Sequence, residues 1–104
     1  MACLNYTIEI SDYAKNMLST HFRFISNVDK DAAIEKKNEI LRAIKDLEFM
    51  PERYPFFEAE FIPKNKYHKL YVKKWYIILY QIKDNIVYVD YVLDCREDYY
   101  WLIN

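Results

Sequence analysis

Three apolar segments follow one another between residues 66 and 94, and this succession constrains the fold more than any other feature. The segments run over Tyr67 to Val72, Trp75 to Ile82 and Ile86 to Leu93. The connections between them are Lys73-Lys74 and Asp84-Asn85. Asp and Asn adopt positive-φ backbone with less strain than most residues, so the second connection suits a two-residue hairpin turn. The pattern predicts a three-stranded antiparallel meander. One face of its last strand should carry Val87, Val89, Tyr91 and Leu93.

The residues before the meander show first a period of two and then a helical period. Residues 4–10 alternate between apolar and polar side chains, which predicts a strand with one buried face. The apolar residues that follow recur every three or four positions, which predicts two helices. Their expected buried stripes are Ala14, Met17, Leu18, Phe22, Ile25 and Val28, then Ala33, Ile40, Leu41, Ile44 and Leu47. Ser11 is the expected N-cap of the first helix, Asp29 or Asp31 begins the second, and Pro51 ends it.

Together these elements predict an α+β fold in a single domain over residues 1–104. The order is a strand, an antiparallel helical hairpin and the three-stranded meander, with a short helix over Glu97 to Ile103 as an optional addition. Residues 51–65 form an ordered loop, and we expect some of Phe56, Phe57 and Phe61 to pack against the domain.

The composition excludes several classes of function. The chain has no glycine, so it cannot contain a Gly-rich phosphate loop or a dinucleotide fingerprint. Cys3 and Cys95 lack the paired spacing of zinc ligands, and we expect reduced thiols and no cofactor. The net charge of -1 gives no general attraction to nucleic acid. No signal peptide or membrane span is expected, and we predict a soluble, cytoplasmic protein.

Four stretches, taken in order, carry a family resemblance that covers nearly the whole chain. They are the opening strand Tyr6-Thr7-Ile8-Glu9-Ile10-Ser11, the helix end Ile40 to Leu47 with Met50-Pro51-Glu52-Arg53, the central strand Trp75 to Ile82, and Ile86 to Leu93 followed by Arg96-Glu97-Asp98-Tyr99. In this order the stretches resemble the ParE/RelE toxin superfamily of bacterial type II toxin–antitoxin (plasmid-stabilisation) systems. The resemblance implies the β-α-α-β-β-β fold and a cognate antitoxin as partner.

The superfamily contains two activities, and the strand residues help to separate them. RelE-like members are ribosome-dependent mRNA endonucleases that use basic residues on the second and third strands, whereas ParE-like members inhibit DNA gyrase by binding. Alignment on the Tyr-Gln-Ile segment places His68 and Leu70 at two strand lysines and Ile77 at the key arginine. Apolar side chains cannot neutralise the charge that develops in phosphoryl transfer. The sequence therefore favours a ParE-like protein that is not an enzyme.

Two alternatives remain open. One is a RelE-like nuclease, acting on RNA at the ribosome, whose catalytic set has moved to His68, Lys69, Arg96 and Tyr99. The other is a degenerate member that binds antitoxin without being toxic.

The resemblance also implies where partners bind. The antitoxin should lay an extended or helical segment over the sheet. Its candidate anchors are the exposed faces of Tyr71, Trp75, Tyr76 and Tyr80, together with the loop aromatics Phe56 and Phe57. A basic patch comprises Lys64, Lys66, Lys69, Lys73 and Lys74. This patch is either a solvated edge that discourages strand aggregation or a surface for RNA, DNA-bound gyrase or an acidic antitoxin segment. Pairing through the helical hairpin would give a homodimer or a toxin–antitoxin heterotetramer.

Overall fold

The structure is a computed structural model that describes residues 5–60, 62–73 and 76–94. Its elements are β1 (Thr7–Ile10), α1 (Asp12–Val28), α2 (Lys30–Asp46), a short 3-10 helix η1 (Pro51–Arg53), β2 (His68–Val72), β3 (Tyr76–Lys83) and β4 (Ile86–Asp94). This order confirms the predicted α+β arrangement. The helix proposed for Glu97 to Ile103 lies outside the described residues.

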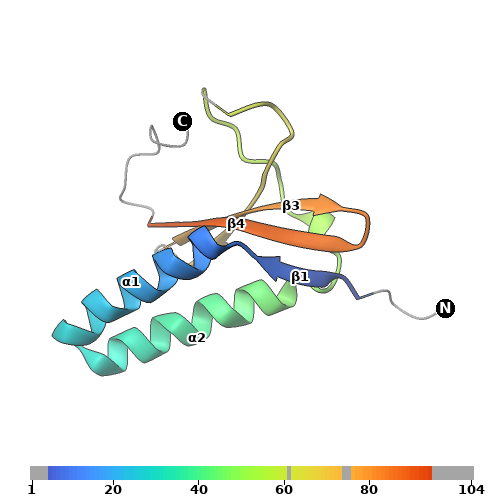
Figure 1. Cartoon of the computed structure of the whole chain (residues 1–104). Helices are drawn as coiled ribbons and strands as arrows, with labels where there is room; N and C mark the ends of the chain where they lie inside the picture. The colour runs from blue at the N-terminus through green and yellow to red at the C-terminus, as the bar shows by residue number, and fades with distance from the viewer. Residues whose placement is uncertain (1–4, 61, 74–75, 95–104) are drawn as a thin grey trace.

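The four strands form one sheet in the order β1-β4-β3-β2. The meander β2-β3-β4 is antiparallel, as predicted, and β1 joins it by pairing parallel to β4. Both helices lie on one side of the sheet, and the connection between η1 and β2 rises on the other side (Figure 1). The last strand in the sequence therefore occupies an interior position in the sheet.

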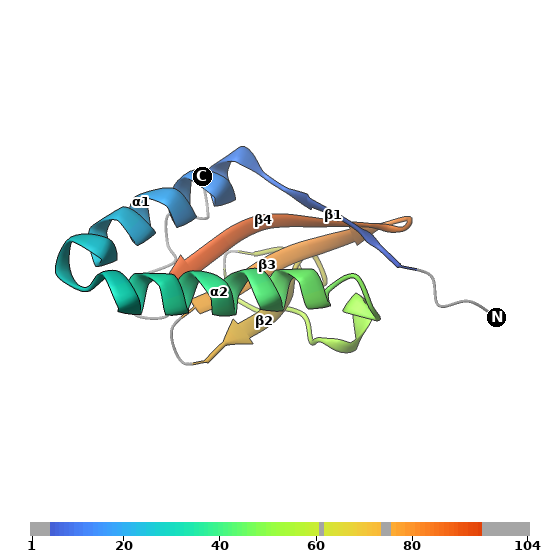
Figure 2. The same cartoon turned by 90° about the horizontal axis from the view of Figure 1, so that it is seen from below.

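The two helices form an antiparallel hairpin whose connection is a single residue, Asp29. Its backbone N–H donates to Ile25 O and ends α1, while its side chain accepts from Ala32 N at 3.1 Å and caps α2. Viewed from below, the helices run side by side across the sheet (Figure 2). Of the two predicted start residues for the second helix, Asp29 is the cap.

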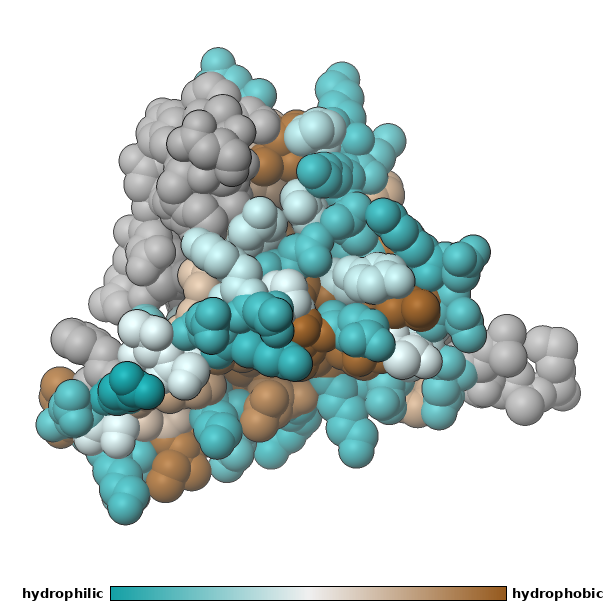
Figure 3. Space-filling model, in the orientation of Figure 1, coloured by the Kyte–Doolittle hydropathy of each residue, from teal (hydrophilic) through white to brown (hydrophobic). Residues whose placement is uncertain are grey.

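The main core lies between the helices and the sheet. Its buried members include Ala14 from α1, Ile40, Ile44 and Leu47 from α2, and Leu70, Ile78, Tyr80, Val87 and Val89 from the strands. The prediction of a buried position is wrong for two residues of the helical stripes, because Val28 is 81% exposed and Leu41 is 43% exposed. Val28 is the final residue of α1 and precedes the α1–α2 connection, at the end of the hairpin that extends beyond the described strands (Figure 2). Hydrophobic side chains reach the surface of the hairpin (Figure 3).

A second, smaller core covers the opposite face of the sheet. Its buried members are Phe57, Tyr67, Ile77, Leu79 and Leu93. The segment between η1 and β2 supplies Phe57 and Tyr67, so the expectation that loop aromatics pack on the domain is confirmed for Phe57. Because both faces of β3 are covered, every residue from Tyr76 to Tyr80 is buried. Within the described ranges, no helix has the length and apolar character to cross a membrane.

An irregularity in β4 changes which of its residues share a face. Tyr91 pairs with Leu79, but Val89 pairs with Tyr80, so Asp90 is an extra residue in the ladder. A β-bulge of this kind reverses the alternation of side chains beyond it. Val89 consequently joins the helix-side core, whereas Tyr91 contacts the opposite one. The prediction that Val87, Val89, Tyr91 and Leu93 share one face is therefore wrong.

Ser11 connects the start of α1 to this bulge. Its Oγ accepts from Ala14 N at 3.0 Å and donates to Asp90 O at 2.9 Å, and its backbone N–H donates to Val89 O at 2.9 Å. The predicted N-cap is thus confirmed, and the same residue also holds the helix against β4.

Residues other than glycine occupy the positive-φ positions that glycine commonly takes in turns. The positive-φ residues of the described chain are Met50, Asn65, Lys73 and Asp84. Asp84, at φ 56°, opens the two-residue β3–β4 turn, which supports the expectation that Asp-Asn serves this hairpin.

Replacing Ser11 with alanine should lower the free energy of unfolding by about 1–2 kcal/mol, because the helix cap and the bond to Asp90 O are both lost. Chemical denaturation of the two proteins measures the difference. Ser26→Ala, at an exposed position within α1, is the matched control and should change stability by less than about 0.5 kcal/mol. An equal effect of the two substitutions would show that Ser11 has no special role.

Candidate functional site

Neighbouring residues of β2 direct their side chains to opposite faces of the sheet. Leu70 lies in the helix-side core. Lys69 and Tyr71 lie on the other face, where the Lys69 Nζ is 5.7 Å from the Tyr71 ring centroid. Tyr71 pairs with Ile77, which belongs to the core on that same opposite face. Leu70 and Ile77, which align with catalytic positions of RelE-like enzymes, are therefore on different faces of the sheet.

His68 is enclosed between aromatic rings. It is 9% exposed, its ring centroid is 4.2 Å from that of Phe56, and it stacks on Tyr80 at 5.3 Å with an interplanar angle of 15°. Its Nδ1 is 2.7 Å from Tyr54 O. Because a carbonyl oxygen only accepts, Nδ1 must carry the proton. His68 thus holds the Tyr54–Phe56 segment against the edge of the sheet. Its side chain lies on the face of β2 opposite to that of Lys69.

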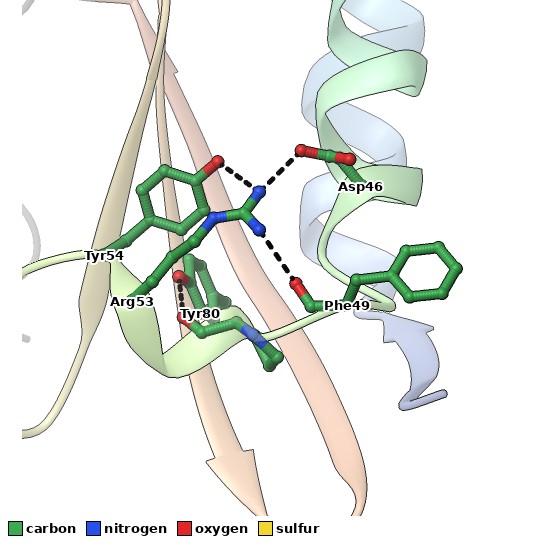
Figure 4. A network of polar contacts seen from close by, with 6 residues as sticks. Asp46, Phe49, Arg53, Tyr54 and Tyr80 are labelled. Atoms are coloured by element: carbon green, nitrogen blue, oxygen red, sulfur yellow. Dashed lines mark hydrogen bonds and ion pairs between the residues drawn. The ribbon is translucent and has the colours of Figure 1, made fainter. Parts of the chain in front are cut away.

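A polar network holds the segment between α2 and β2 (Figure 4). Arg53 donates to Asp46 Oδ2 at 2.7 Å and to the Tyr54 hydroxyl at 2.9 Å, and it approaches Phe49 O at 3.4 Å. No periodic pattern in the sequence predicts this network, because its members come from a helix end and an irregular segment. Pro51, expected to end the second helix, instead begins η1, because α2 already ends at Asp46. Arg53, two residues after this proline, was the available clue.

Tyr80 joins this segment to the centre of the sheet. Its side chain is fully buried, and its hydroxyl donates to Pro51 O at 2.7 Å. Burial is the main cause that raises the pKa of Tyr80. The phenol therefore stays neutral and acts as a buried structural donor.

A second polar cluster, which the sequence did not reveal, lies at the bulge. Gln81 Nε2 donates to Asp90 Oδ2 at 2.7 Å. Burial first, and then the charge of Asp90, raises the pKa of Tyr67 to about 12. Lys66 Nζ is 5.3 Å from the Tyr67 ring centroid. A neutral phenol beside a carboxylate can donate a hydrogen bond, but at neutral pH it is not a base.

The expected partner-binding residues divide into exposed and buried groups. Tyr71 is 54% exposed and Phe56 is 38% exposed, so both can contact a partner. Exposed faces were also expected for Tyr76 and Tyr80, and this is wrong because both are buried; the candidate loop anchor Phe57 is buried too. Tyrosine suits both a core and a surface, and the sequence pattern does not separate the two cases. Trp75 lies outside the described residues.

The described part of the basic patch carries uncompensated charge. Its members are Lys64, Lys66, Lys69 and Lys73, whereas Lys74 lies outside the described residues. In the part of the chain that the structure describes, no acidic side chain forms an ion pair with any of these four. Their charges are therefore available to an anionic partner.

The remaining candidates for catalysis, Arg96 and Tyr99, lie outside the described residues, as does Cys95. Among residues 5–60, 62–73 and 76–94, no group of three or more His, Cys, Asp or Glu side chains is placed to hold a metal ion. The two described candidates, His68 and Lys69, are not brought together.

Comparison with known proteins gives a likeness of fold. No protein-family model and no curated protein sequence matches this chain. A chain in a solved structure described as "Chromosomal ParDE TA system from P. aeruginosa" is similar, with a TM-score of 0.72 and 12% sequence identity. The match covers 86% of this chain and 95% of that chain. The two chains share a fold, as the sequence resemblance implied.

Replacing Tyr80 with phenylalanine should lower the free energy of unfolding by about 1–3 kcal/mol, because it leaves the Pro51 carbonyl without its donor. The matched control is Tyr71→Phe, which removes an exposed hydroxyl and should change stability by less than about 0.5 kcal/mol. Thermal and denaturant unfolding test both variants, and equal stabilities would contradict the assigned role of the Tyr80 hydroxyl.

Alkaline pH should weaken the fold through Tyr67. The ordinary pKa of a tyrosine side chain is 10.0, and in the folded protein the pKa of Tyr67 is raised to about 12. The stability that the neutral phenol contributes is therefore complete below pH 10 and is lost as the pH rises toward 12. The free energy of unfolding should fall more steeply across this range in the native chain than in Tyr67→Phe. Identical pH profiles would mean that Tyr67 titrates normally.

Proposed function

We propose that this chain is the toxin of a bacterial type II toxin–antitoxin pair, ParE-like in acting by binding rather than by catalysis. The proposed target is DNA gyrase, and a cognate antitoxin neutralises the toxin. Two lines of support agree. The ordered sequence stretches resemble the ParE/RelE superfamily, and the fold is shared with a chain of a ParDE system over most of both chains.

The separation of His68 from Lys69 is the observation that favours binding over catalysis. Cleavage of RNA needs a cation near the phosphate and a proton-transferring group within reach of the same atoms. His68 is held on one face of β2 by Tyr54 O and two rings. Lys69 lies on the other face, near Ile77 and Leu79, which are buried and apolar. The two side chains therefore point away from each other, and this supports binding over their joint action on one phosphate.

The exposed apolar residues suggest where partners meet the toxin. Phe56 pairs with His68 at the start of β2, and Tyr71 lies near the end of this strand on the opposite face, so an antitoxin segment that wraps around this edge would contact both. On the helical hairpin, Val28, Ile34 and Leu41 are exposed. Pairing of two copies of this chain through their helical hairpins would bury these side chains. Such pairing would give a homodimer or, with antitoxin bound, a heterotetramer.

Controlled expression of the chain in bacteria tests the proposal. We expect growth arrest with filamentation, together with loss of negative supercoiling in a reporter plasmid. Purified chain should inhibit supercoiling by gyrase, and the product of a short neighbouring gene for a DNA-binding protein should relieve both effects. Ile78→Asp is the control for a requirement for folded protein, because it places a charge in the core.

Other outcomes would overturn the proposal in different ways. Arrest with ribosome-dependent truncation of transcripts, abolished by His68→Ala or Lys69→Ala, would identify a RelE-like nuclease. Expression without arrest would leave a non-toxic, antitoxin-binding member.

A further inference from the structure

The turn between α2 and η1 carries two large apolar side chains that face solvent. Phe49 is 45% exposed and Met50 is 63% exposed, and neither is a member of either core. The Phe49 ring points away from the polar network of Arg53 (Figure 4). Single apolar residues are ordinary on a protein surface, but these two are adjacent and belong to one turn.

The backbone of Met50 is strained. Its φ is 47° and its ψ is 53°, in the left-handed region. Asn65 and Asp84, also at positive φ, are of the types that enter this region readily, whereas Met50 and Lys73 are not. Strain of this kind is concentrated at ligand-binding sites, where the side chain has a use that glycine cannot serve.

Hydrogen bonds hold this turn in one conformation. Arg53 N donates to Met50 O at 3.2 Å, and Arg53 Nη1 approaches Phe49 O at 3.4 Å. Glu48 O accepts from Tyr6 N at 2.8 Å, which fixes the turn to the residue before β1. Side chains on such a preorganised backbone lose less conformational entropy when they bind a partner.

The charge around the turn is acidic. The carboxylates of Asp46, Glu48 and Glu52 border it, and its flanking cations are Lys45 and Arg53. Arg53 is engaged by Asp46 at 2.7 Å. In the part of the chain that the structure describes, neither Glu48 nor Glu52 forms an ion pair. The turn thus combines two apolar anchors with an excess of negative charge.

We propose that the Phe49–Met50 turn is the surface through which the toxin contacts its target, and that the matching surface of the target is basic with an apolar pocket. The inference rests on the proposed function, in which the target is gyrase, an enzyme that acts on DNA. Such an enzyme contacts the phosphates with lysine and arginine side chains, so an acidic surface with apolar anchors is complementary to it. Large side chains that fill a pocket supply most of the binding energy of an interface.

The turn differs in charge and place from the surfaces that the antitoxin and a second copy would use. The residues near β2 include lysines and suit an acidic partner, whereas the turn suits a basic one. The turn follows the C-terminal end of α2, and the hairpin connection lies at the other end of this helix (Figure 2). Substitutions in the turn should therefore leave antitoxin binding unchanged.

The test uses the full chain, purified gyrase and a supercoiling assay. Phe49→Ser and Met50→Gly should each weaken inhibition about tenfold, as expected when an interface anchor is removed. Met50→Gly also relieves the strain at positive φ, so its melting temperature should be no lower than that of the native chain. Met50→Leu keeps an apolar side chain at the same position and should inhibit as the native chain does.

Tyr13→Ser is the matched control for the loss of an exposed ring. Tyr13 is 48% exposed and lies in the first turn of α1, so this variant should inhibit gyrase as the native chain does. Glu48→Lys should weaken inhibition, because it reverses a charge at the edge of the contact. Added salt should weaken the binding of the native chain to gyrase more than that of Glu48→Gln.

Four results would overturn the inference, and they differ in what they leave standing. Unchanged inhibition by Phe49→Ser and Met50→Gly would remove the inference and leave the proposed function intact, whereas a native chain that does not inhibit gyrase would remove both. If the two variants lose binding to the product of the neighbouring gene and still inhibit gyrase, the turn belongs to the antitoxin interface. Self-association of the native chain that Phe49→Ser abolishes would identify a second copy as the occupant.

Discussion

The burial of β3 from both sides is the constraint on which the rest of the structure depends. Burying a large aliphatic or aromatic side chain stabilises a fold by about 1.5–3 kcal/mol, and β3 has such side chains on both faces. The helical hairpin covers one face, and the segment between η1 and β2 covers the other. The contacts of Arg53 and the Tyr80 hydroxyl serve this second layer, because they hold the start of an irregular segment in place.

The same two-sided packing separates the chemistry of β2. A strand whose neighbour is buried on both faces sends consecutive side chains into different environments. His68 enters a stack of rings, while Lys69 remains at a surface with Tyr71. Side chains adjacent in the sequence are thereby assigned to different roles, one structural and one available to partners.

The elements of the fold were predictable from the sequence because each leaves a periodic signal. The strand expected within residues 4–10 is found at Thr7–Ile10, the two helices follow their three- and four-residue spacings except at Val28 and Leu41, and Ser11 is the cap. The faces of the strands were harder to predict. Alternation in β4 continues through Asp90 without interruption, so a bulge that depends on pairing with β3 leaves no mark in the residues themselves.

Predicting the candidate site was limited for a related reason. Tyr71, Tyr76 and Tyr80 are the same residue type in similar strands, but one is exposed and two are buried. The difference comes from which segment covers each residue in the folded chain. The helices cover the face that carries Tyr76 and Tyr80, whereas an irregular segment covers only part of the face that carries Tyr71. Tertiary contacts of this kind are set by segments distant in sequence.

The interior position of β4 has a consequence for how the protein is made. Of the four described strands, β4 is the last to leave the ribosome. However, β1 can enter the sheet only by pairing with β4. The contacts between Ser11 and Asp90 join residues 79 positions apart. Contacts between such distant residues form late, since a long loop must close first. The nascent chain therefore cannot complete its sheet until synthesis has passed β4, and before that point it has no finished binding surface.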